Sequence, residues 1–155
     1  MSKRTYIVDL DGTVARLDHR LPLIQGEPES KDWDAFFDAC TKDEPIRDVI
    51  DVIRAVAFYA DATREETRII YLTGRPERIR LKTAAWILTN KLPNGELVMR
   101  KDGDHRPDTQ AKKELMQKIM SEGDRIAGVF EDRPAMCRVW RSMGITCFQL
   151  NDQEF

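Results

Sequence analysis

Short apolar runs that end abruptly in polar residues recur along this chain, and they constrain its fold more than any other feature. Four such runs, rich in the β-branched residues typical of buried strands, are residues 5–10, 67–75, 125–133 and 145–150. Apolar residues at helical spacing mark the segments 46–60, 76–92, 107–123 and 134–144. Strands that alternate with helices of this length predict an α/β fold, in which helices cover both faces of a mainly parallel sheet.

The size of the chain predicts one domain. With 155 residues and 41% hydrophobic content it can bury a single core, and we expect one domain over residues 1–155. Residues 14–44 interrupt the alternation, so we expect an elaborated segment that lies beside the first turn and helps to cover a site there. Neither a signal peptide nor an apolar run of membrane-spanning length is visible, which predicts a cytoplasmic protein without membrane contact.

Charge and cysteine content exclude several classes of protein. The formal net charge of −2 is not that of a polycation that coats nucleic acid. Residues 1–66 carry 9 basic and 15 acidic side chains, whereas residues 67–155 carry 16 basic and 12 acidic ones, so an anionic substrate favours the second half. The three cysteines are scattered and form no CxxC pair, which predicts reduced thiols rather than a zinc site.

The acids that close the first strand pose a problem of charge. In "DLDGT", Asp9 and Asp11 place two carboxylates at one strand end, and burying them unpaired would be costly. A divalent cation removes the repulsion, and Mg²⁺ needs only a few protein oxygens. The cluster "FEDR" supplies Asp132 as a ligand from another strand end, with Glu131 as a neighbour that orients ligands or waters. Taken singly, the first cluster also fits a plain Asp-Gly turn, and the second fits helix capping.

Two further segments offer groups that bind phosphate. "LTGR" contains Thr73, Gly74 and Arg75, and it combines a hydroxyl and an amide with a fork-shaped guanidinium. Lys112 stands near the start of the helical segment 107–123, one turn after Asp108. Each has a plain alternative, because "LTGR" also fits a strand-to-helix turn and a helical lysine usually faces solvent. Position favours function, since three polar clusters close three strands and ligands gather beyond such strand ends.

In this order, "DLDGT", "LTGR", Lys112 and "FEDR" resemble the four motifs of the haloacid dehalogenase superfamily of phosphotransferases. More narrowly, "DLDGTVARLDHR", "RPDTQAKKE" and "FEDRPAMCRVWRSMGITCFQL" resemble the 3′-phosphatase domain of bacteriophage polynucleotide kinase/phosphatase. The resemblance extends from Tyr6 to about Leu150. It implies a Rossmann-like fold with a small or absent cap.

The resemblance also implies a role for each motif residue. Asp9 would be the nucleophile that forms an aspartyl-phosphate, and Asp11 would be the general acid and base. Thr73 and Lys112 would bind phosphoryl oxygens, and Lys112 would offset the charge of Asp9. The cofactor would be Mg²⁺, held by Asp9, Asp11 and Asp132, with Glu131 behind them.

Further residues match positions near the substrate of the phage domain. Arg20 and Arg75 match arginines that contact substrate or phosphate, and Gly74 lies beside them in the motif. Arg106 and Asp108 match positions near a helix start, where they would contact a nucleotide or orient Lys112. For each arginine the alternative is a surface ion pair, which contributes little to stability. Glu131 is a departure, because the phage enzyme has an aspartate there.

These features predict a Mg²⁺-dependent phosphomonoesterase that acts on the 3′-phosphate ends of polynucleotides. The sequence contains no GxxxxGK[ST] phosphate-binding loop, so we expect a phosphatase without its kinase. The first alternative is a phosphatase of nucleotides or other small phosphate esters, because the sequence has no basic stripe interleaved with aromatic residues of the kind that stacks single strands. The second is a catalytically silent interaction module with the same fold. The expected partner is a phosphorylated nucleic-acid end or a nucleotide, and the resemblance to phage enzymes also suggests self-association.

Overall fold

A five-stranded parallel sheet forms the centre of the computed structural model, which describes residues 3–64 and 66–152. The strands are β1 (Arg4–Val8), β2 (Thr67–Pro76), β3 (Glu96–Arg100), β4 (Arg125–Glu131) and β5 (Cys147–Gln149). Their order across the sheet is β3-β2-β1-β4-β5, and every neighbouring pair is parallel. The α/β fold predicted from the sequence is therefore confirmed.

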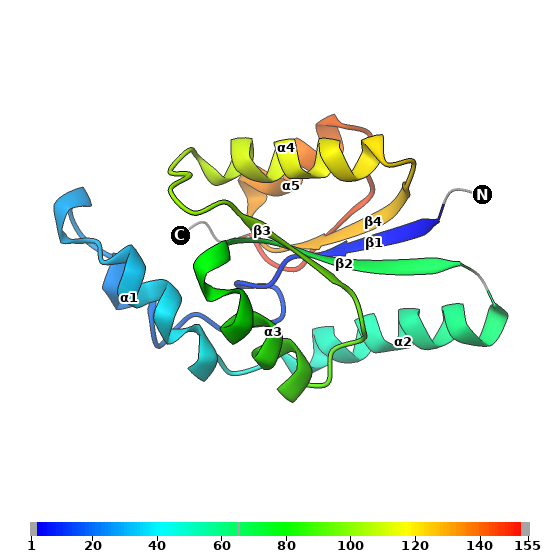
Figure 1. The fold of residues 1–155 in the computed structure, drawn as a ribbon, viewed down its shortest axis with the longest axis horizontal. Coiled ribbons are helices and arrows are strands. Elements are labelled where there is room, and N and C mark those ends of the chain that lie inside the picture. The colour runs from blue at the N-terminus through cyan, green and yellow to red at the C-terminus, as the bar shows by residue number, and fades with distance from the viewer. Residues whose placement is uncertain (1–2, 65, 153–155) are drawn as a thin grey trace.

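Helices cover both faces of this sheet (Figure 1). They are α1 (Trp33–Asp38), α2 (Arg47–Thr63), α3 (Arg80–Thr89), α4 (Asp108–Ser121) and α5 (Pro134–Ser142). Helices α2 and α3 pack on one face, and α4 and α5 pack on the other. Each of these four connects two consecutive strands, as parallel pairing requires. None of the helices among the described residues is long and apolar enough to span a membrane.

Strand β1 contributes to both layers of the core. Ile7 and Val8 point to opposite faces, because successive strand residues do so. Val8 belongs to the same buried cluster as Ile50 of α2 and Trp86 of α3, whereas Ile7 belongs to that of Trp140 in α5. Burial of each aliphatic side chain contributes about 1.5–3 kcal/mol. Packing on both sides therefore fixes β1 and the residues that follow it.

Strand β3 is not among the strands predicted from the sequence. It pairs with β2 at the edge of the sheet, from Ile70 opposite Glu96 to Thr73 opposite Met99. Only three of its five residues are apolar, and charged residues stand at both ends, so the run is too short to be distinguished from a loop. The consequence for the site is that loop 101–107 begins at the carboxyl end of the sheet.

Helix α3 also begins later than the segment 76–92 predicts. Pro76 still pairs with Arg100 of β3, and a 3₁₀ turn over Glu77–Ile79 precedes the helix. The sheet pairing thus extends through "LTGR" and delays the helix to Arg80. The predicted helix 107–123 corresponds to α4, whose first residue is Asp108.

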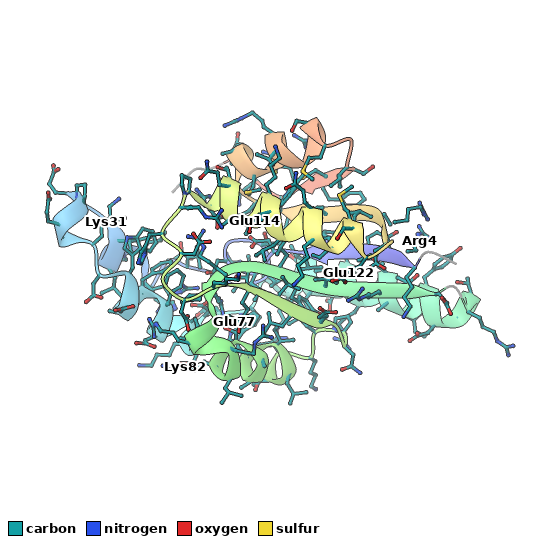
Figure 2. All side chains as sticks on the ribbon, turned by 45° about the horizontal axis from the view of Figure 1, so that its top comes forward. Arg4, Lys31, Glu77, Lys82, Glu114 and Glu122 are labelled. Carbon is teal, nitrogen blue, oxygen red and sulfur yellow. The ribbon has the colours of Figure 1, made fainter. Side chains whose placement is uncertain are left out.

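Residues 14–44 form short helical turns around α1, which lies beyond the end of the sheet toward which β1 runs (Figure 1). Asp32 caps α1, since its Oδ1 accepts a hydrogen bond from the backbone nitrogen of Ala35 at 2.9 Å. Figure 2 shows Lys31, just before this helix, at the opposite end of the molecule from Arg4 of β1. Residues 14–44 therefore extend the end of the molecule where the strands finish.

Candidate active site

Asp9 follows β1 directly and is buried, with 3% of its surface exposed. The chain turns sharply behind it, because Gly12 adopts φ +84°. A side chain at Gly12 would also overlap the carboxylate of Asp132, so the turn can approach the end of β4 only with glycine there. Thr13 Oγ1 lies 3.2 Å from Asp9 Oδ2 and 3.1 Å from Asp132 Oδ1. This turn therefore joins acids from two strand ends.

Lys112 enters the same site from the second turn of α4. Its ammonium donates hydrogen bonds to Asp9 Oδ1 at 2.7 Å and to Glu131 Oε2 at 3.3 Å. Only 2% of the residue is exposed, so it does not belong to a solvated helix face. Burial lowers the pKa of Lys112, but the charges of Asp9 and Glu131 outweigh it and hold the pKa well above its usual value.

Three buried acids surround this lysine and form the group that could hold a metal ion. Carboxylate oxygens of Asp9, Glu131 and Asp132 all lie within 4.8 Å of one another. Burial and the charge of Glu131 raise the pKa of Asp9, and the same two causes raise that of Asp132 to about 6. One lysine does not balance three carboxylates, and hard oxygen donors suit Mg²⁺. The donor set therefore fits a divalent cation.

The three acids differ in how many hydrogen bonds their carboxylates already accept. Glu131 Oε1 accepts hydrogen bonds from the backbone nitrogens of Asp132 and Arg133 at 3.3 Å, and its Oε2 accepts from Lys112 and Trp140. Asp132 accepts a hydrogen bond from the Thr13 hydroxyl, which also donates to Asp9. Asp9 and Asp132 are thus the more available ligands, and Glu131 supports Lys112 and the backbone behind them.

Asp11 faces a different set of partners. Its Oδ1 accepts hydrogen bonds from Arg20 Nη2 at 2.6 Å and from Arg75 Nη2 at 2.6 Å and Nε at 2.9 Å. Both arginines are fully buried, which excludes the surface ion pair as their role. Burial raises the pKa of Asp11, but the charges of Arg75 and Arg20 outweigh it and lower the pKa to about 2.

Asp43 completes this network and is a residue that sequence reasoning missed. Its Oδ1 accepts from Arg20 Nε at 2.8 Å, and its Oδ2 accepts from Arg20 Nη2 at 2.7 Å and Arg75 Nη2 at 2.9 Å. The imidazole of His19 lies 2.7 Å from the same carboxylate. Asp43 stands in the loop "TKDE", which matches no motif. The only signal was indirect, because two buried arginines beside one acid require a second acid.

Thr73 and Gly74 lie where β2 passes the site. Thr73 is fully buried, and its Oγ1 accepts a hydrogen bond from the backbone nitrogen of Arg75 at 3.2 Å. A side chain at Gly74 would overlap Asp108 Oδ1, so glycine lets the start of α4 approach β2. Asp108 in turn accepts from Arg100 Nη2 at 2.6 Å and from Arg133 Nη1 at 3.0 Å. It therefore joins α4 to residues of two strand ends.

Arg106 is the candidate residue that lies furthest from this arrangement. Its guanidinium pairs with Asp104 at 2.7 Å and with Glu114 at 2.6 Å, and 48% of its side chain is exposed. It lies among the residues that line the same pocket as Asp9 and Asp11, but its ion pairs are with Asp104 and Glu114 rather than with those two acids. Its ion pairs resemble those of an ordinary surface arginine.

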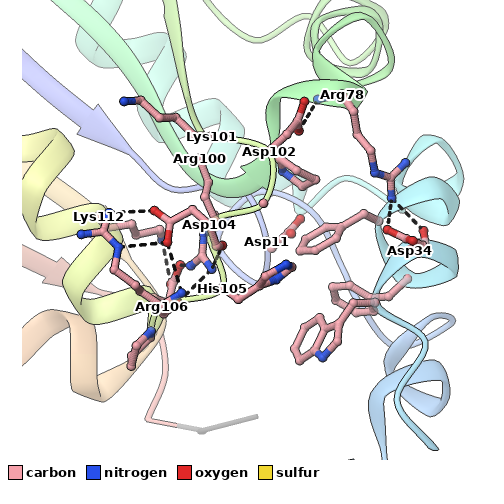
Figure 3. A pocket seen from close by; sticks show the side chains of 18 of the residues that line it. Asp11, Asp34, Arg78, Arg100, Lys101, Asp102, Asp104, His105, Arg106 and Lys112 are labelled. Carbon is pink, nitrogen blue, oxygen red and sulfur yellow. Dashed lines mark hydrogen bonds and ion pairs between the residues drawn. The ribbon is translucent and has the colours of Figure 1, made fainter. Parts of the chain in front are cut away.

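A pocket of about 550 Å³ opens onto these groups (Figure 3). Asp9, Asp11 and Lys112 lie among its lining residues, together with Gly74 and Asp108. Loop 101–107 borders the pocket on one side, and α1 with its exposed Asp34 borders it on the other (Figure 3). The volume lies within the range of roughly 300–1,000 Å³ typical of ligand sites. A phosphate ester can therefore reach Asp9 through this pocket.

Comparison with solved structures first identifies the class of protein. A haloacid dehalogenase-like hydrolase from Streptococcus pneumoniae aligns with a TM-score of 0.59 at 10% identity, over 97% of this chain and 88% of that one. At this identity the likeness shows the shared fold. The chain therefore has the fold of the haloacid dehalogenase-like hydrolases.

The family is shown by a match over almost the whole chain. Residues 3–155 match the family model described as the polynucleotide kinase PNKP phosphatase domain, and the chain therefore belongs to this family. The resemblance seen in the sequence is thus confirmed. The matched residues include every candidate site residue named above.

Two relatives extend the comparison. A protein of the Autographa californica nuclear polyhedrosis virus, described as a bifunctional polynucleotide kinase/RNA ligase, is 27% identical over 143 residues, which are 92% of this chain and 18% of that protein. A chain in the structure of a Pnkp1/Rnl/Hen1 complex has a TM-score of 0.78 and 25% identity, over 99% of this chain and 48% of that one. This chain therefore spans less than half the length of either relative.

Proposed function

We propose that this chain is a Mg²⁺-dependent 3′-phosphatase of polynucleotide ends that works through an aspartyl-phosphate. The observation that carries the proposal is the position of Asp9, a buried carboxylate held by Lys112 and Thr13 in the lining of a surface pocket. Family membership supports a polynucleotide substrate. So does the structural relative from a Pnkp1/Rnl/Hen1 complex.

The first step would transfer the phosphoryl group to Asp9. A carboxylate oxygen of Asp9 attacks phosphorus, the bond from phosphorus to the 3′ oxygen breaks, and that oxygen takes a proton from Asp11. Lys112 counteracts the effect of burial on Asp9 and offsets the negative charge that gathers during transfer. Because Arg20 and Arg75 keep Asp11 ionised, its acid role requires that the substrate phosphate draw them away from it.

The second step would release phosphate. Asp11 accepts a proton from a water molecule, the water oxygen attacks phosphorus, and the bond between phosphorus and Asp9 breaks. The ionised form that the two arginines favour is the one this step needs. When bound, Mg²⁺ would neutralise charge between carboxylate and phosphate, with Asp9 and Asp132 as ligands and the residue 11 backbone as a further oxygen donor.

The experiment that tests this function compares substrates. Phosphate release is measured, with Mg²⁺ present, from a 3′-phosphorylated oligonucleotide, the matched 5′-phosphorylated oligonucleotide and mononucleotide phosphates. We expect a strong preference for the 3′-phosphorylated oligonucleotide and no turnover by Asp9→Asn. Equal or faster turnover of mononucleotides would replace the proposal with a nucleotidase, and full activity of Asp9→Asn would exclude the nucleophile.

A further inference from the structure

Three aromatic side chains of α1 line the pocket at some remove from the catalytic acids. Trp33, Phe36 and Phe37, here called the aromatic wall, have ring centroids 5.4 to 6.0 Å apart. Phe36 is buried beneath, whereas Trp33 is 49% exposed. The other tryptophans, Trp86 and Trp140, are 4% and 1% exposed. An indole ring is thus presented to the pocket on a packed aromatic base.

The aromatic wall is held in place by ion pairs and by the arginine network. Arg78, just before α3, pairs with Asp34 of α1 at 2.9 Å (Figure 3). It also pairs with Asp38 of α1 at 3.0 Å. The guanidinium carbon of Arg20 lies 4.3 Å from the centre of the Phe36 ring, while Arg20 itself binds Asp11. The wall therefore has a defined position relative to the catalytic acids before any ligand binds.

The opposite side of the pocket is formed by loop 101–107. In Figure 3 the ring of His105 projects from this loop toward the α1 side. The charge of Arg106 on the same loop is already paired with Asp104 and Glu114. An exposed indole on one side of the pocket and an imidazole on the other can therefore both stack on a planar ring.

Resting on the proposed function, we propose that the aromatic wall binds the nucleobase of the 3′-terminal nucleotide whose phosphate is attached at Asp9. Every nucleobase has two π-faces, and an aromatic side chain stacks on either without reading sequence. The volume of about 550 Å³ lies in the range of small-ligand sites and suits a single nucleotide, whose base must be unpaired to stack on the wall. The wall selects unpaired ends that carry a base, and it discriminates against phosphate esters without one.

The aromatic wall could not be predicted from the sequence, because its residues and loop 101–107 are separated by more than sixty residues along the chain. The fold brings them to one pocket, since α1 and loop 101–107 both lie at the carboxyl end of the sheet. The pocket thus offers the aromatic contact to a base that the sequence alone did not reveal, and whose apparent lack favoured small phosphate esters as substrates.

Binding can be tested without turnover. In the Asp9→Asn variant, Trp33 is the exposed fluorophore, so titration with a 3′-phosphorylated single-stranded oligonucleotide should quench tryptophan emission. An oligonucleotide of equal charge whose terminal nucleotide is abasic should quench weakly. Adding Trp33→Leu should remove the response, because Trp86 and Trp140 are buried. Equal quenching by the two ligands would overturn the inference.

Kinetics on the active enzyme provide the second test. Trp33→Leu should raise KM for the base-bearing substrate by about 5- to 100-fold, the range expected from base stacking, and leave KM for the abasic one unchanged. Trp33→Phe should restore most of the loss. Phe58→Leu on α2, where 76% of the side chain is exposed, is the matched control and should change neither.

The outcomes separate the two proposals. If the wild-type enzyme releases phosphate from mononucleotides but not from 3′-phosphorylated ends, the proposed function fails. If it acts on 3′-phosphorylated ends and Trp33→Leu affects both substrates alike, or neither, the inference about the aromatic wall is overturned while the function stands.

Discussion

Asp9 and Asp11 are residues of the same type two positions apart, yet their neighbours give them opposite properties. Asp9 shares a buried space with Glu131 and Asp132, and burial and Glu131 raise its pKa. Asp11 contacts Arg20 and Arg75, which lower its pKa to about 2. A bound cation would thus stabilise the ionised form of Asp9, whereas Asp11 is kept ionised without one. The low pKa of Asp11 suits the proposed second step, in which Asp11 accepts a proton, whereas its proposed acid role needs Arg20 and Arg75 to move away from it.

Asp43 offers a direct test of how much the arginine pair depends on its second acid. Asp43→Asn leaves Arg20 and Arg75 buried with one carboxylate fewer, and breaking such a buried pair costs about 3–5 kcal/mol of unfolding free energy. With Asp43 neutral, Arg20 and Arg75 depend more on Asp11 and hold it more firmly in its ionised form. The proposed acid step then becomes harder, so we also expect kcat to fall about 10- to 100-fold. Urea unfolding and phosphate release measure the two effects.

The exposed Asp18 is the control for this change. Asp18 lies next to His19 but outside the buried network, so Asp18→Asn should change neither the unfolding free energy nor kcat. The kcat is measured at a urea concentration well below the unfolding midpoint of the variant. If Asp43→Asn loses stability but keeps its kcat there, Asp43 supports only the fold.

At the scale of elements, the sequence predicts those that have a strong period and misses those that depend on neighbours. Strands β1, β2, β4 and β5 and helices α2 to α5 follow apolar runs and helical spacing, and all were predicted. Strand β3 was missed because Leu97, Val98 and Met99 are its only apolar residues and pairing with β2 defines it. Helix α3 starts late because β2 extends through Pro76.

The site shows the same division. Motif residues at strand ends could be found from the sequence, since parallel strands bring their carboxyl ends together. The structure gathers Asp9, Lys112, Glu131 and Asp132 in one group, and Asp11, Arg20 and Arg75 in another. Asp43 and the aromatic wall could not be found, because each acquires its role from a contact distant in sequence. Arg106 matched by position alone and pairs with surface acids.

Asp108 links three elements, and its removal should be felt beyond its own helix. It is the first residue of α4 and binds Arg100 and Arg133, while Lys112 lies 3.7 Å away. Asp108→Asn should lower the unfolding free energy at pH 7 by about 2–3 kcal/mol, as expected when hydrogen bonds to a charged group are lost. It should also lower kcat, because Lys112 follows on the next turn.

The pH dependence identifies the cause. Burial raises the pKa of Asp108, but Lys112, Arg133 and Arg100 outweigh it and lower the pKa below its usual value. A lowered pKa stabilises the folded protein above the unfolded value near pH 4, and the contribution is lost as pH falls through the folded value. The difference in unfolding free energy between wild type and Asp108→Asn should thus narrow below about pH 4. Asp18→Asn, at an exposed position away from these contacts, should show no such difference. A difference for Asp108→Asn that does not depend on pH would argue against the charge effect.

Across the whole molecule, buried charge is concentrated at the end of the sheet where β1, β2 and β4 finish, and it is distributed unevenly there. Asp11 and Asp43 face Arg20 and Arg75, so that network is balanced. The group of Asp9, Glu131 and Asp132 faces Lys112 and has an excess of negative charge. The opposite layers of the core are apolar and cannot compensate it. A divalent cation would complete the balance in the second group.

Added Mg²⁺ should therefore stabilise the folded protein as well as activate it. Binding to the folded state alone contributes about 2.7 kcal/mol at a hundredfold excess over Kd, so the unfolding midpoint should rise with Mg²⁺ concentration. Asp132→Asn should abolish most of this rise, whereas Asp18→Asn should keep it. EDTA should remove phosphatase activity from the wild-type enzyme, and Mg²⁺ should restore it. Full activity in chelator, or an equal Mg²⁺-dependent rise in Asp132→Asn, would show that the excess charge is met by the protein itself and that the cation is not bound here.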